Sequence, residues 1–358
     1  MAGALRNVIR TKLRVAMIPA DGVGREVLPA ARSVLEALGT ALPKLEFTHL
    51  DAGFEHFTKY GTALPDETLR VLREESDCAM FGAVSSPSRR VAGYSSPIVA
   101  MRKALDLYAN IRPVKSVADL PGERSNIDMV IVRENTECLY IKEETLTLGS
   151  VGKEARATRL ITERASRRIG QMAFETALAR GPSPLLTIVH KSNVLSVTDG
   201  LFRETVRSVP SLPGIDGRYD CVKVEEQLVD SMVYRMFREP QVFDVAVAPN
   251  MYGDIISDAA AALVGSLGLV PSVNAGDNFI MGEPVHGSAP DIMGRGIANP
   301  LASIRSAALM LVHLGYDDQA KRVDDSVDAV LRRGDVLTPD LGGKSTTQQV
   351  VDAVLKQI

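Results

Sequence analysis

The chain has 358 residues, which is too long for one ordinary hydrophobic core and favours two domains. Hydrophobic residues make up 45% and charged residues 24%, a mixture typical of globular enzymes and not of disordered chains. The formal net charge of −3 provides no basic field that would attract nucleic acid or an anionic membrane. No apolar run approaches the roughly 20 residues that a membrane helix needs, and three widely spaced cysteines argue against a disulfide framework.

The N-terminal segment is basic, with Arg6, Arg10, Lys12 and Arg14 and no acid before Asp21. This composition is typical of mitochondrial targeting signals, although the segment is very short and overlaps the first predicted strand. A plain basic N-terminus of a cytoplasmic protein is the alternative. We take the mitochondrial matrix as the predicted location.

Short apolar runs alternate with helical patterns along the chain, which indicates an α/β protein. Strands are predicted at residues 13–18, 47–50, 79–81, 129–132, 186–189 and 242–247. Helices are predicted at residues 23–38, 164–179, 225–237, 255–267, 300–314, 319–333 and 346–355, so that the chain is almost wholly helical after about Met251. Residues 149–156 and 210–220 are rich in glycine, proline, serine and charge, and we expect loops or edge hairpins there.

Two acids, Asp254 and Asp258, follow the apolar strand predicted at 242–247. If a helix begins near Tyr252, the two carboxylates stand one turn apart on the same face. Two like charges so placed repel each other unless a cation lies between them. The pair predicts either a Mg²⁺ or Mn²⁺ site or two acids that favour the positive end of the helix dipole.

Three arginines and a lysine are further candidates for binding a substrate or acting in catalysis. Arg102, Arg112 and Arg133 could bind carboxylates in a forked manner, or each could form a surface ion pair. Arg133 directly follows a predicted strand, and the ends of parallel strands are where α/β sheets bind ligands. Lys191 and Asn193 follow another predicted strand, and the lysine is either a general base with a lowered pKa or an exposed loop residue.

Two stretches rich in glycine, residues 18–24 and 283–291, match neither the GxGxxG pattern nor the P-loop. Glycine permits close approach of the backbone to a cofactor, but either stretch could also be only a turn.

Taken in this order, the segments resemble the β-decarboxylating dehydrogenase family of isocitrate, isopropylmalate and homoisocitrate dehydrogenases. The resemblance runs from about Leu13 to the C-terminus. Its motifs are Pro-Ala-Asp-Gly-Val-Gly, Leu-Tyr-Ala-Asn-Ile-Arg-Pro-Val-Lys, Val-Arg-Glu-Asn-Thr-Glu, His-Lys-Ser-Asn-Val, Asn-Met-Tyr-Gly-Asp-Ile-Ile-Ser-Asp and Glu-Pro-Val-His-Gly-Ser-Ala-Pro-Asp. It implies an α/β, isopropylmalate dehydrogenase-like two-domain fold with a mixed sheet, which is not a Rossmann fold.

The resemblance also implies the domains and the catalytic groups. Residues 1–107 and 265–358 form the expected large cofactor-side domain, and residues 108–264 the small central domain with the dimer interface. Active sites are expected in the cleft of a homodimer. Arg102, Arg112 and Arg133 are the expected clamps on the malate-type carboxylates, Tyr140 is the expected acid, and Lys191 is the expected base on the substrate hydroxyl.

Metal ligands and cofactor contacts are implied in the same way. Asp230, Asp254 and Asp258 are the expected ligands of Mg²⁺ or Mn²⁺, with Lys191, Asn193 and Asp230 coming from the neighbouring subunit. The residues at the family's cofactor positions are Asn193, Glu283, His286, Gly287, Ser288, Ala289, Asp291 and Asn299. The carboxylate at 291 would accept hydrogen bonds from a ribose 2′-hydroxyl and repel a 2′-phosphate, so NAD is expected and not NADP.

The segment at residues 84–102 bears on substrate choice. Its stretch Tyr94-Ser-Ser-Pro-Ile-Val-Ala is nearly a signature of the fungal homoisocitrate enzymes, which the segment resembles. Arg89, Arg90 and Ser96 could receive a distal carboxylate, and isocitrate enzymes carry asparagine where this chain has Ile98. The expected reaction is oxidative decarboxylation of homoisocitrate to 2-oxoadipate in lysine biosynthesis by the α-aminoadipate pathway.

Alternatives to this function are dehydrogenation of isocitrate or 3-isopropylmalate, and a catalytically silent regulatory subunit. Two residues depart from the family pattern. Ala20 replaces a glycine, which we expect to matter little, and Cys138 is either a thiol sensitive to oxidants or an inert buried one.

Overall fold

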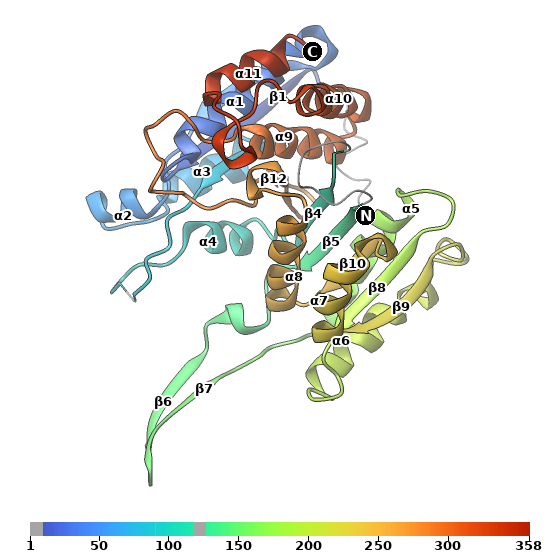
Figure 1. The fold of residues 1–358 in the computed structure, drawn as a ribbon. Coiled ribbons are helices and arrows are strands. Elements are labelled where there is room, and N and C mark those ends of the chain that lie inside the picture. Colours follow the sequence, from blue (N-terminus) through green and yellow to red (C-terminus); the bar gives the residue numbers. More distant parts are fainter. Residues whose placement is uncertain (1–9, 90, 118–126) are drawn as a thin grey trace. The chain divides into compact units, whose positions relative to one another are not determined.

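The computed structural model describes residues 10–89, 91–117 and 127–358, and their packing divides the chain into two units (Figure 1). Unit 1 contains the chain up to Leu107, the described part of residues 112–127, and Ala261–Ile358. Unit 2 contains Tyr108–Ile111 and Asp128–Ala260. Two of the divisions, between Ile111 and Arg112 and between Ala260 and Ala261, fall inside strand β4 (Ala109–Lys115) and helix α8 (Asn250–Leu263), so no linker composition marks them.

Unit 1 is built on a mixed sheet with the strand order β2-β1-β3-β12-β11. Strand β1 (Lys12–Ala20) pairs in parallel with β2 (Lys44–His49) and β3 (Cys78–Ala83). Strand β12 (Ile280–Gly282) is parallel to β3, and β11 (Val273–Ala275) is antiparallel to β12. Every residue of β3 is buried, because helices cover the central strands and leave mainly the edge strand exposed.

The helices of unit 1 are α1 (Gly24–Ala37), α2 (Phe54–Tyr60), α3 (Asp66–Glu74), α4 (Pro97–Ala104), α9 (Leu301–Leu314), α10 (Asp317–Arg333) and α11 (Thr347–Leu355). Short 3-10 helices lie at Gly39–Ala41, Leu267–Leu269 and Pro339–Leu341. Helix α9 is buried on most of its surface and packs against both α1 and α10.

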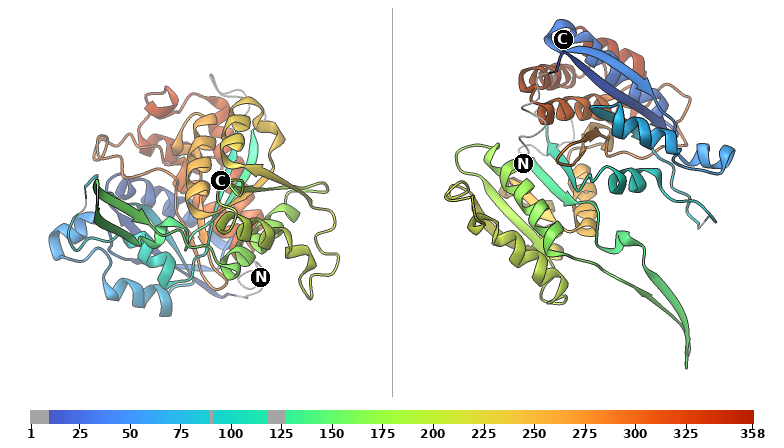
Figure 2. Two further views of the ribbon diagram at one scale, coloured as in Figure 1. Left: turned by 90° about the horizontal axis from the view of Figure 1, so that it is seen from below. Right: turned by 180° about the vertical axis from the view of Figure 1, so that it is seen from behind.

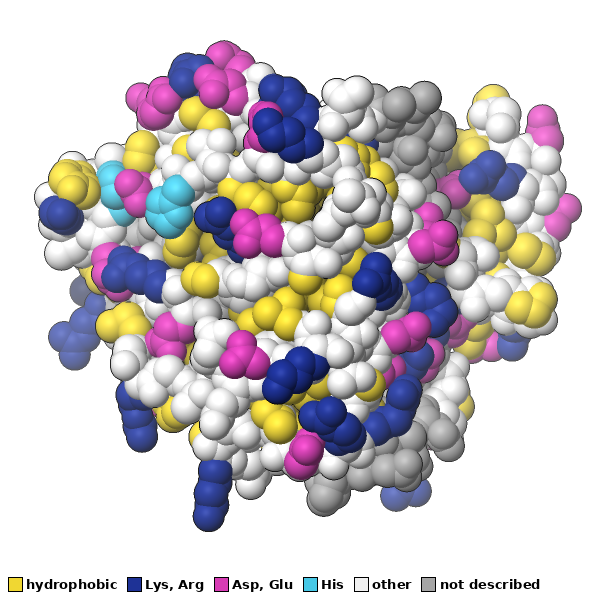
Figure 3. Space-filling model, turned by 90° about the horizontal axis from the view of Figure 1, so that it is seen from above, with side chains coloured by type: hydrophobic (Ala, Val, Ile, Leu, Met, Phe, Trp, Pro, Cys, Tyr) yellow, Lys and Arg dark blue, Asp and Glu magenta, His cyan; other side chains and the backbone are white. Residues whose placement is uncertain are grey.

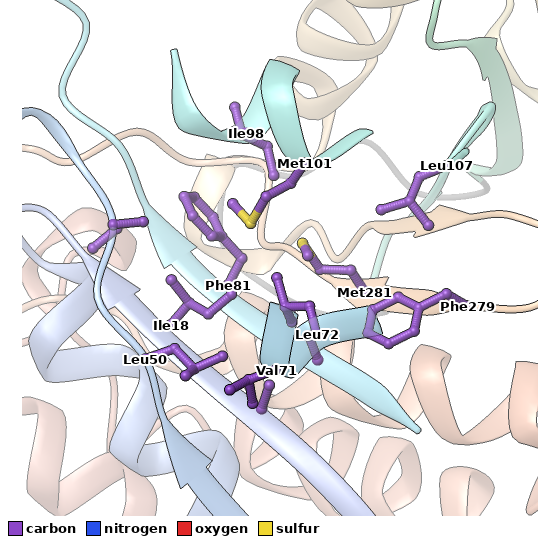
Figure 4. Close-up of a cluster of buried hydrophobic side chains, with 14 residues drawn as sticks. Ile18, Leu50, Val71, Leu72, Phe81, Ile98, Met101, Leu107, Phe279 and Met281 are labelled. Atoms are coloured by element: carbon purple, nitrogen blue, oxygen red, sulfur yellow. The ribbon is translucent and has the colours of Figure 1, made fainter. Parts of the chain in front are cut away.

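A hydrophobic cluster fixes helix α4 in unit 1 (Figure 4). Ile98 and Met101 lie one helical turn apart and are buried with Phe81 and Met281 of the sheet. Burying a side chain of this size contributes about 1.5–3 kcal/mol. The cluster therefore holds the helix that carries Arg102.

Unit 2 contains a parallel sheet with the order β5-β10-β8-β9. These strands are β5 (Asp128–Glu134), β8 (Leu185–His190), β9 (Lys223–Leu228) and β10 (Val245–Ala248). The helices are α5 (Glu163–Leu178), α6 (Thr198–Arg207), α7 (Val229–Arg238) and α8, with 3-10 helices at Leu139–Ile141, Val209–Ser211 and Pro240–Val242.

A hairpin of β6 (Glu144–Gly149) and β7 (Gly152–Ala157) extends away from the rest of unit 2 (Figures 1 and 2). Leu146, Leu148 and Val151 on it are 67%, 84% and 97% exposed. The prediction of an edge hairpin at 149–156 is confirmed, although the hairpin also includes residues 144–148.

The α/β class with a mixed sheet is confirmed, but two predicted segments are wrong. The helix predicted at 225–237 begins only at Val229, because the run before it is β9, which pairs with β8. The prediction of an almost wholly helical C-terminal part misses β11 and β12, whose three residues each are too few to show a period.

Two of the four basic residues near the N-terminus belong to β1. Lys12 pairs with Glu46 at 3.0 Å, and Arg14 binds Asp77 through its guanidinium at 2.9 Å and its backbone N–H at 2.8 Å. These contacts stabilise the sheet of unit 1. Because Lys12 and Arg14 have this structural role, their charge is weaker evidence for a targeting signal. Arg6 lies outside the described residues, and the mitochondrial location stays a prediction.

Acidic and basic side chains are interspersed on the face shown in Figure 3. Among the described helices, none is long and apolar enough to cross a membrane.

The two glycine-rich stretches contact each other in unit 1. The backbone N–H of Val23 donates to the carbonyl oxygen of Ser288 at 2.9 Å. Gly22 has φ +57°, and a Cβ there would lie 2.0 Å from that same oxygen. Ala20 has φ 55°, so the departure from glycine at this position places a side chain in the left-handed region, at a cost of about 1–2 kcal/mol. It matters more than the sequence indicated.

We predict that Gly22→Ala lowers the free energy of unfolding much more than Gly39→Ala. Both glycines have nearly the same φ, +57° and +55°, but a Cβ at Gly39 meets no atom within 4 Å. Gly39→Ala should cost about 1–2 kcal/mol from the backbone alone. Urea denaturation of both variants measures the difference, and equal losses would show that the contact with Ser288 adds nothing.

Candidate functional site

In unit 2, the carboxylate of Asp254 on helix α8 contacts side chains from the end of strand β5 and from the turn that contains Tyr140. Arg133 at the end of β5 is 2% exposed and forms an ion pair with Asp254 of α8. Its Nε and Nη2 also donate to Oδ1 of Asn250 at 3.0 and 2.8 Å. The hydroxyl of Tyr140 donates to the other oxygen of Asp254, and the guanidinium of Arg133 lies 5.2 Å from the centre of the tyrosine ring. A Cβ at Gly253 would clash with Arg133, so glycine permits this close approach.

Tyr140 lies in a short turn with an unusual backbone. Cys138 before it has φ 66° and Lys142 after it has φ 60°, both in the left-handed region. Such residues cost about 1–3 kcal/mol each and persist where the surroundings fix them. Cys138 is fully buried and its N–H donates to the carbonyl oxygen of Leu160 at 2.9 Å. The burial favours the interpretation of Cys138 as an inert thiol.

Lys191 follows the last residue of β8, and its Nζ donates to Asp230 in the first turn of α7 at 2.6 Å. This contact lowers the pKa of Asp230, so its carboxylate keeps its charge at a lower pH than an ordinary aspartate does. A metal ligand must carry that charge. Asn193 lies exposed in the loop that follows.

The three predicted metal ligands do not form one cluster in a single chain. Asp254 and Asp258 lie one turn apart on α8, whereas Asp230 lies on α7, and the described residues contain no group of three acids, histidines or cysteines that could hold a metal. Two carboxylates one turn apart fit part of a Mg²⁺ site, because this ion accepts one or two carboxylates and takes its other ligands from water and substrate.

In unit 1, two predicted site residues pair with each other. Arg102 on α4 is 7% exposed, and its Nη2 lies 3.0 Å from Glu283. Asn274 donates to the same carboxylate oxygen. The Nε of Arg102 is buried and has no hydrogen-bond partner among the described residues, which suits a group that binds a carboxylate ligand. Arg112 in β4 is also buried.

The segment expected to select the substrate has a structural anchor. Tyr94 contacts the rings of Phe54 and Phe57 at 5.0 and 5.3 Å between centroids, and its hydroxyl donates to the carbonyl oxygen of Ser85 at 3.1 Å. Tyr94 therefore fixes the segment on α2. Ile98, where isocitrate enzymes carry asparagine, lies in the hydrophobic cluster of unit 1.

Of the residues expected to receive a distal carboxylate, Ser96 is half-buried directly before α4 and Arg89 is exposed. Arg90 lies outside the described residues.

The loop at 283–291 contains groups that suit a dinucleotide. His286 has a buried Nε2 without a partner among the described residues, and burial lowers its pKa, so its ring is neutral at neutral pH. A Cβ at Gly287 would meet open space, which leaves the backbone accessible there. Asp291 is exposed, as a carboxylate that binds a ribose hydroxyl must be.

Three other predicted cofactor residues also have local structural contacts. Ser288 accepts a hydrogen bond from the hydroxyl of Ser85 at 2.9 Å, and the carbonyl oxygen of Ala289 accepts the N–H of Ile292 at 3.1 Å. Asn299 accepts from the N–H of Leu301 at the start of α9 and donates to Asp340 at 2.9 Å.

Sequence reasoning missed several buried groups around these sites. Asp21 is fully buried and accepts the N–H groups of Phe54, Glu55 and Ser85. Glu134 is buried, which raises its pKa, and accepts from Thr136 and Glu137. Both acids lie within motifs that carry the family resemblance, and this was the only feature of the sequence that could have indicated their importance. Their partners are visible only in the structure.

Comparison with known proteins identifies the family. Residues 14–354 match the family Isocitrate/isopropylmalate dehydrogenase. The chain is 48% identical over 345 residues to the isocitrate/homoisocitrate dehydrogenase of Thermus thermophilus, with 96% of this chain and 98% of the relative covered. It is 44% identical over 353 residues to the 3-isopropylmalate/3-methylmalate dehydrogenase of Methanocaldococcus jannaschii, with 96% and 98% covered.

Among solved structures, the isocitrate dehydrogenase from Methylococcus capsulatus matches with a TM-score of 0.88 at 37% identity, covering 96% of this chain and 99% of that one. The predicted isopropylmalate dehydrogenase-like two-domain fold is confirmed by these matches. The chain therefore belongs to the isocitrate/isopropylmalate dehydrogenase family and is an oxidoreductase of that family.

Proposed function

We propose that this chain oxidises homoisocitrate with NAD⁺ and then decarboxylates it to 2-oxoadipate and CO₂, as in lysine biosynthesis by the α-aminoadipate pathway. The observation that carries the proposal is the contact of Asp254 with both Arg133 and Tyr140. It brings together the guanidinium of Arg133, which can bind a substrate carboxylate, the carboxylate of Asp254, which can bind a metal, and the phenol of Tyr140, which can donate a proton.

In the oxidation step, Lys191 removes the proton of the substrate hydroxyl while the hydrogen on the same carbon leaves with its electron pair for NAD⁺. The carbonyl double bond forms as these two bonds break. Mg²⁺, when bound by Asp254, Asp258 and Asp230, would acidify the hydroxyl and stabilise negative charge on its oxygen. Arg102, Arg112 and Arg133 hold the substrate carboxylates, since guanidinium groups bind carboxylates through paired hydrogen bonds.

In the second step, the bond to the β-carboxylate breaks and CO₂ leaves, while the electron pair of that bond passes into an enolate. Tyr140 then donates its hydroxyl proton to the enolate carbon. A phenol suits this role because it is a neutral donor at neutral pH. Its turn at Leu139–Ile141 and its bond to Asp254 limit the positions of that proton.

Homoisocitrate is proposed over its rivals for two reasons. The segment around Tyr94 resembles the fungal homoisocitrate enzymes, and the Thermus thermophilus relative is named for isocitrate and homoisocitrate. Isocitrate is one methylene shorter, a difference that binding resolves by only about 1–3 kcal/mol. We therefore expect some turnover of isocitrate.

The proposed function predicts that kcat/KM for NADH formation is highest with homoisocitrate, lower with isocitrate and lowest with 3-isopropylmalate. All three are measured with the same enzyme, NAD⁺ and Mg²⁺. A higher value for 3-isopropylmalate would reject the substrate proposal but retain the reaction. NAD⁺ binding without turnover of any of the three would instead favour a silent regulatory subunit.

A second copy of the chain is the proposed partner. Of the thirteen large hydrophobic side chains that are exposed among the described residues, ten belong to unit 2. These include Leu146 and Leu148 on the hairpin, Val194 and Val197 beside Lys191, and Tyr234 on the helix of Asp230. A concentration of exposed apolar side chains on one unit is typical of an interface with another protein. The proposed homodimer would bring Asp230 of one chain to Asp254 of the other.

Mixing two inactive variants should restore activity if the subunits share their sites. Lys191→Met and Tyr140→Phe should each lose most turnover while they remain folded. A mixed dimer then retains one site with both groups intact. Random reassociation should give about one quarter of wild-type activity, since half of the dimers are mixed and have one working site each. Rates are measured after joint unfolding and refolding.

The matched control mixes Lys191→Met with Asp230→Asn. Each site would take both Lys191 and Asp230 from one and the same neighbouring subunit. Every site of a mixed dimer therefore lacks one of the two groups, and this mixture should stay inactive. Lack of recovery in the first mixture, with dimers present, would contradict shared sites. Near-normal turnover of Lys191→Met alone would reject its role as the base.

The exposed carboxylate of Asp291 leads to a prediction on the cofactor. The enzyme should prefer NAD⁺ to NADP⁺ in kcat/KM, and Asp291→Ser should reduce this preference at least about 10-fold, the value of one hydrogen bond to a charged group. Asp216→Ser, which removes the same charge from an exposed loop of unit 2, should not alter the ratio. Preference of the wild type for NADP⁺ would overturn the cofactor proposal.

A further inference from the structure

A fully buried carboxylate contacts the backbone of Lys191. Asp199 is 0% exposed and lies in the first turn of α6, where a negative charge is favoured by the helix dipole. Its Oδ2 accepts the N–H of Lys191 at 2.7 Å. None of the roles proposed so far uses this acid.

The contact with Asp199 completes the restraint of the Lys191 backbone. The carbonyl oxygen of Lys191 accepts the N–H groups of Val194 and Leu195 at 3.0 and 2.9 Å. With both its N–H and its C=O bound, the peptide unit on each side of Lys191 has a fixed orientation. The direction in which the side chain leaves the backbone is fixed as well, because it depends on those two units.

An arginine whose side chain is mostly buried holds Asp199 in turn. The Nη2 of Arg159 lies 2.8 Å from Oδ1 of Asp199, and the arginine side chain is 12% exposed. The two atoms lack hydrogen-bond geometry, so the contact is an ion pair. Arg159 also donates to the hydroxyl of Tyr252 at 2.9 Å and lies 4.4 Å from the centre of that ring. It therefore links the Lys191 loop to the first turn of α8, the helix that carries Asp254 in its second turn.

The segment of Arg159 also contacts the turn of Tyr140. Leu160, the next residue, pairs with Cys138 through the hydrogen bond described above. Arg159 thus lies where the backbones that carry the proposed acid, the proposed base and a proposed metal ligand come together in unit 2.

Stability alone is a weak reason for such a pair. Taking two charges out of water costs several kcal/mol per ion, and apolar residues of similar size often replace a buried ion pair without loss of stability. A positioning role accounts for the pair, because the N–H of Lys191 needs an acceptor of fixed location and the ion pair with Arg159 holds the carboxylate of Asp199 in place. Resting on the proposed role of Lys191 as the base, we infer that Asp199 and Arg159 are positioning residues that orient Lys191 toward the substrate hydroxyl.

The test compares Asp199→Asn with a double variant, Asp199→Leu with Arg159→Met, in the full-length enzyme. The asparagine keeps the shape but loses the negative charge. The double variant removes both charges and keeps most of the apolar packing. Arg180→Met is the matched control, since it breaks a partly buried pair with Asp128 and Asp244 elsewhere in unit 2.

Three quantities are measured: kcat and KM with homoisocitrate, the melting temperature, and amide hydrogen exchange of the peptide that contains Lys191. The double variant should melt near the wild type, but its kcat should fall at least about 10-fold while KM changes less than about threefold, because a displaced base affects the chemical step. Amide exchange at Lys191 should be faster. Arg180→Met should melt lower with unchanged kcat and unchanged exchange at Lys191.

A kcat of the double variant within about twofold of the wild type would overturn the inference. If the double variant does not fold, Asp199→Asn decides: it loses the ion pair that holds the acceptor of Lys191, so kcat should fall while KM changes little, and a kcat within about twofold of the wild type would overturn the inference. A wild type without activity on any hydroxy acid would reject the proposed function instead. Amide exchange at Lys191 would then still test whether Asp199 and Arg159 restrain this backbone.

Discussion

The ion pair between Arg133 and Asp254 is the interaction on which the proposed catalytic arrangement depends. A guanidinium that is 2% exposed needs a negative partner, because an unpaired buried charge costs several kcal/mol. Asp254 meets that need and binds Tyr140 with its second oxygen, so strand β5, the turn before the hairpin and helix α8 are held together. The three elements therefore share the single carboxylate of Asp254.

The sequence predicted the elements that have long, regular patterns. Strands β1, β5 and β8 are apolar runs buried on both faces, and α9 and α10 each run for several turns, so their positions were clear. Strand β9 was not clear, because Lys223–Leu228 carries charges at positions that also suit a helix and its pairing with β8 decides its structure. Tertiary pairing of this kind overrides local preference.

For the candidate site, matched motifs indicated residues but not their contacts. Arg133, Lys191 and Asp254 follow strands in long family motifs and could be named from sequence. The contact of Asn250 with Arg133, which lies 117 positions away, could not be predicted, and neither could the contact of Asp199 with Lys191. Tyr94 shows the reverse case: the sequence associated it with substrate choice, whereas the structure gives it an anchoring contact with Phe54, Phe57 and Ser85. Residues that orient other residues have no pattern of their own.

In the proposed reaction, one turnover couples oxidation to loss of a carboxylate, with Lys191 accepting one proton and Tyr140 donating the other. The most direct test is the stoichiometry of NADH, CO₂ and 2-oxo acid released from the preferred hydroxy acid in D₂O. Equal amounts of all three are expected, with one deuterium on the carbon that lost CO₂. NADH formed without CO₂, or CO₂ released in excess of NADH, would contradict it.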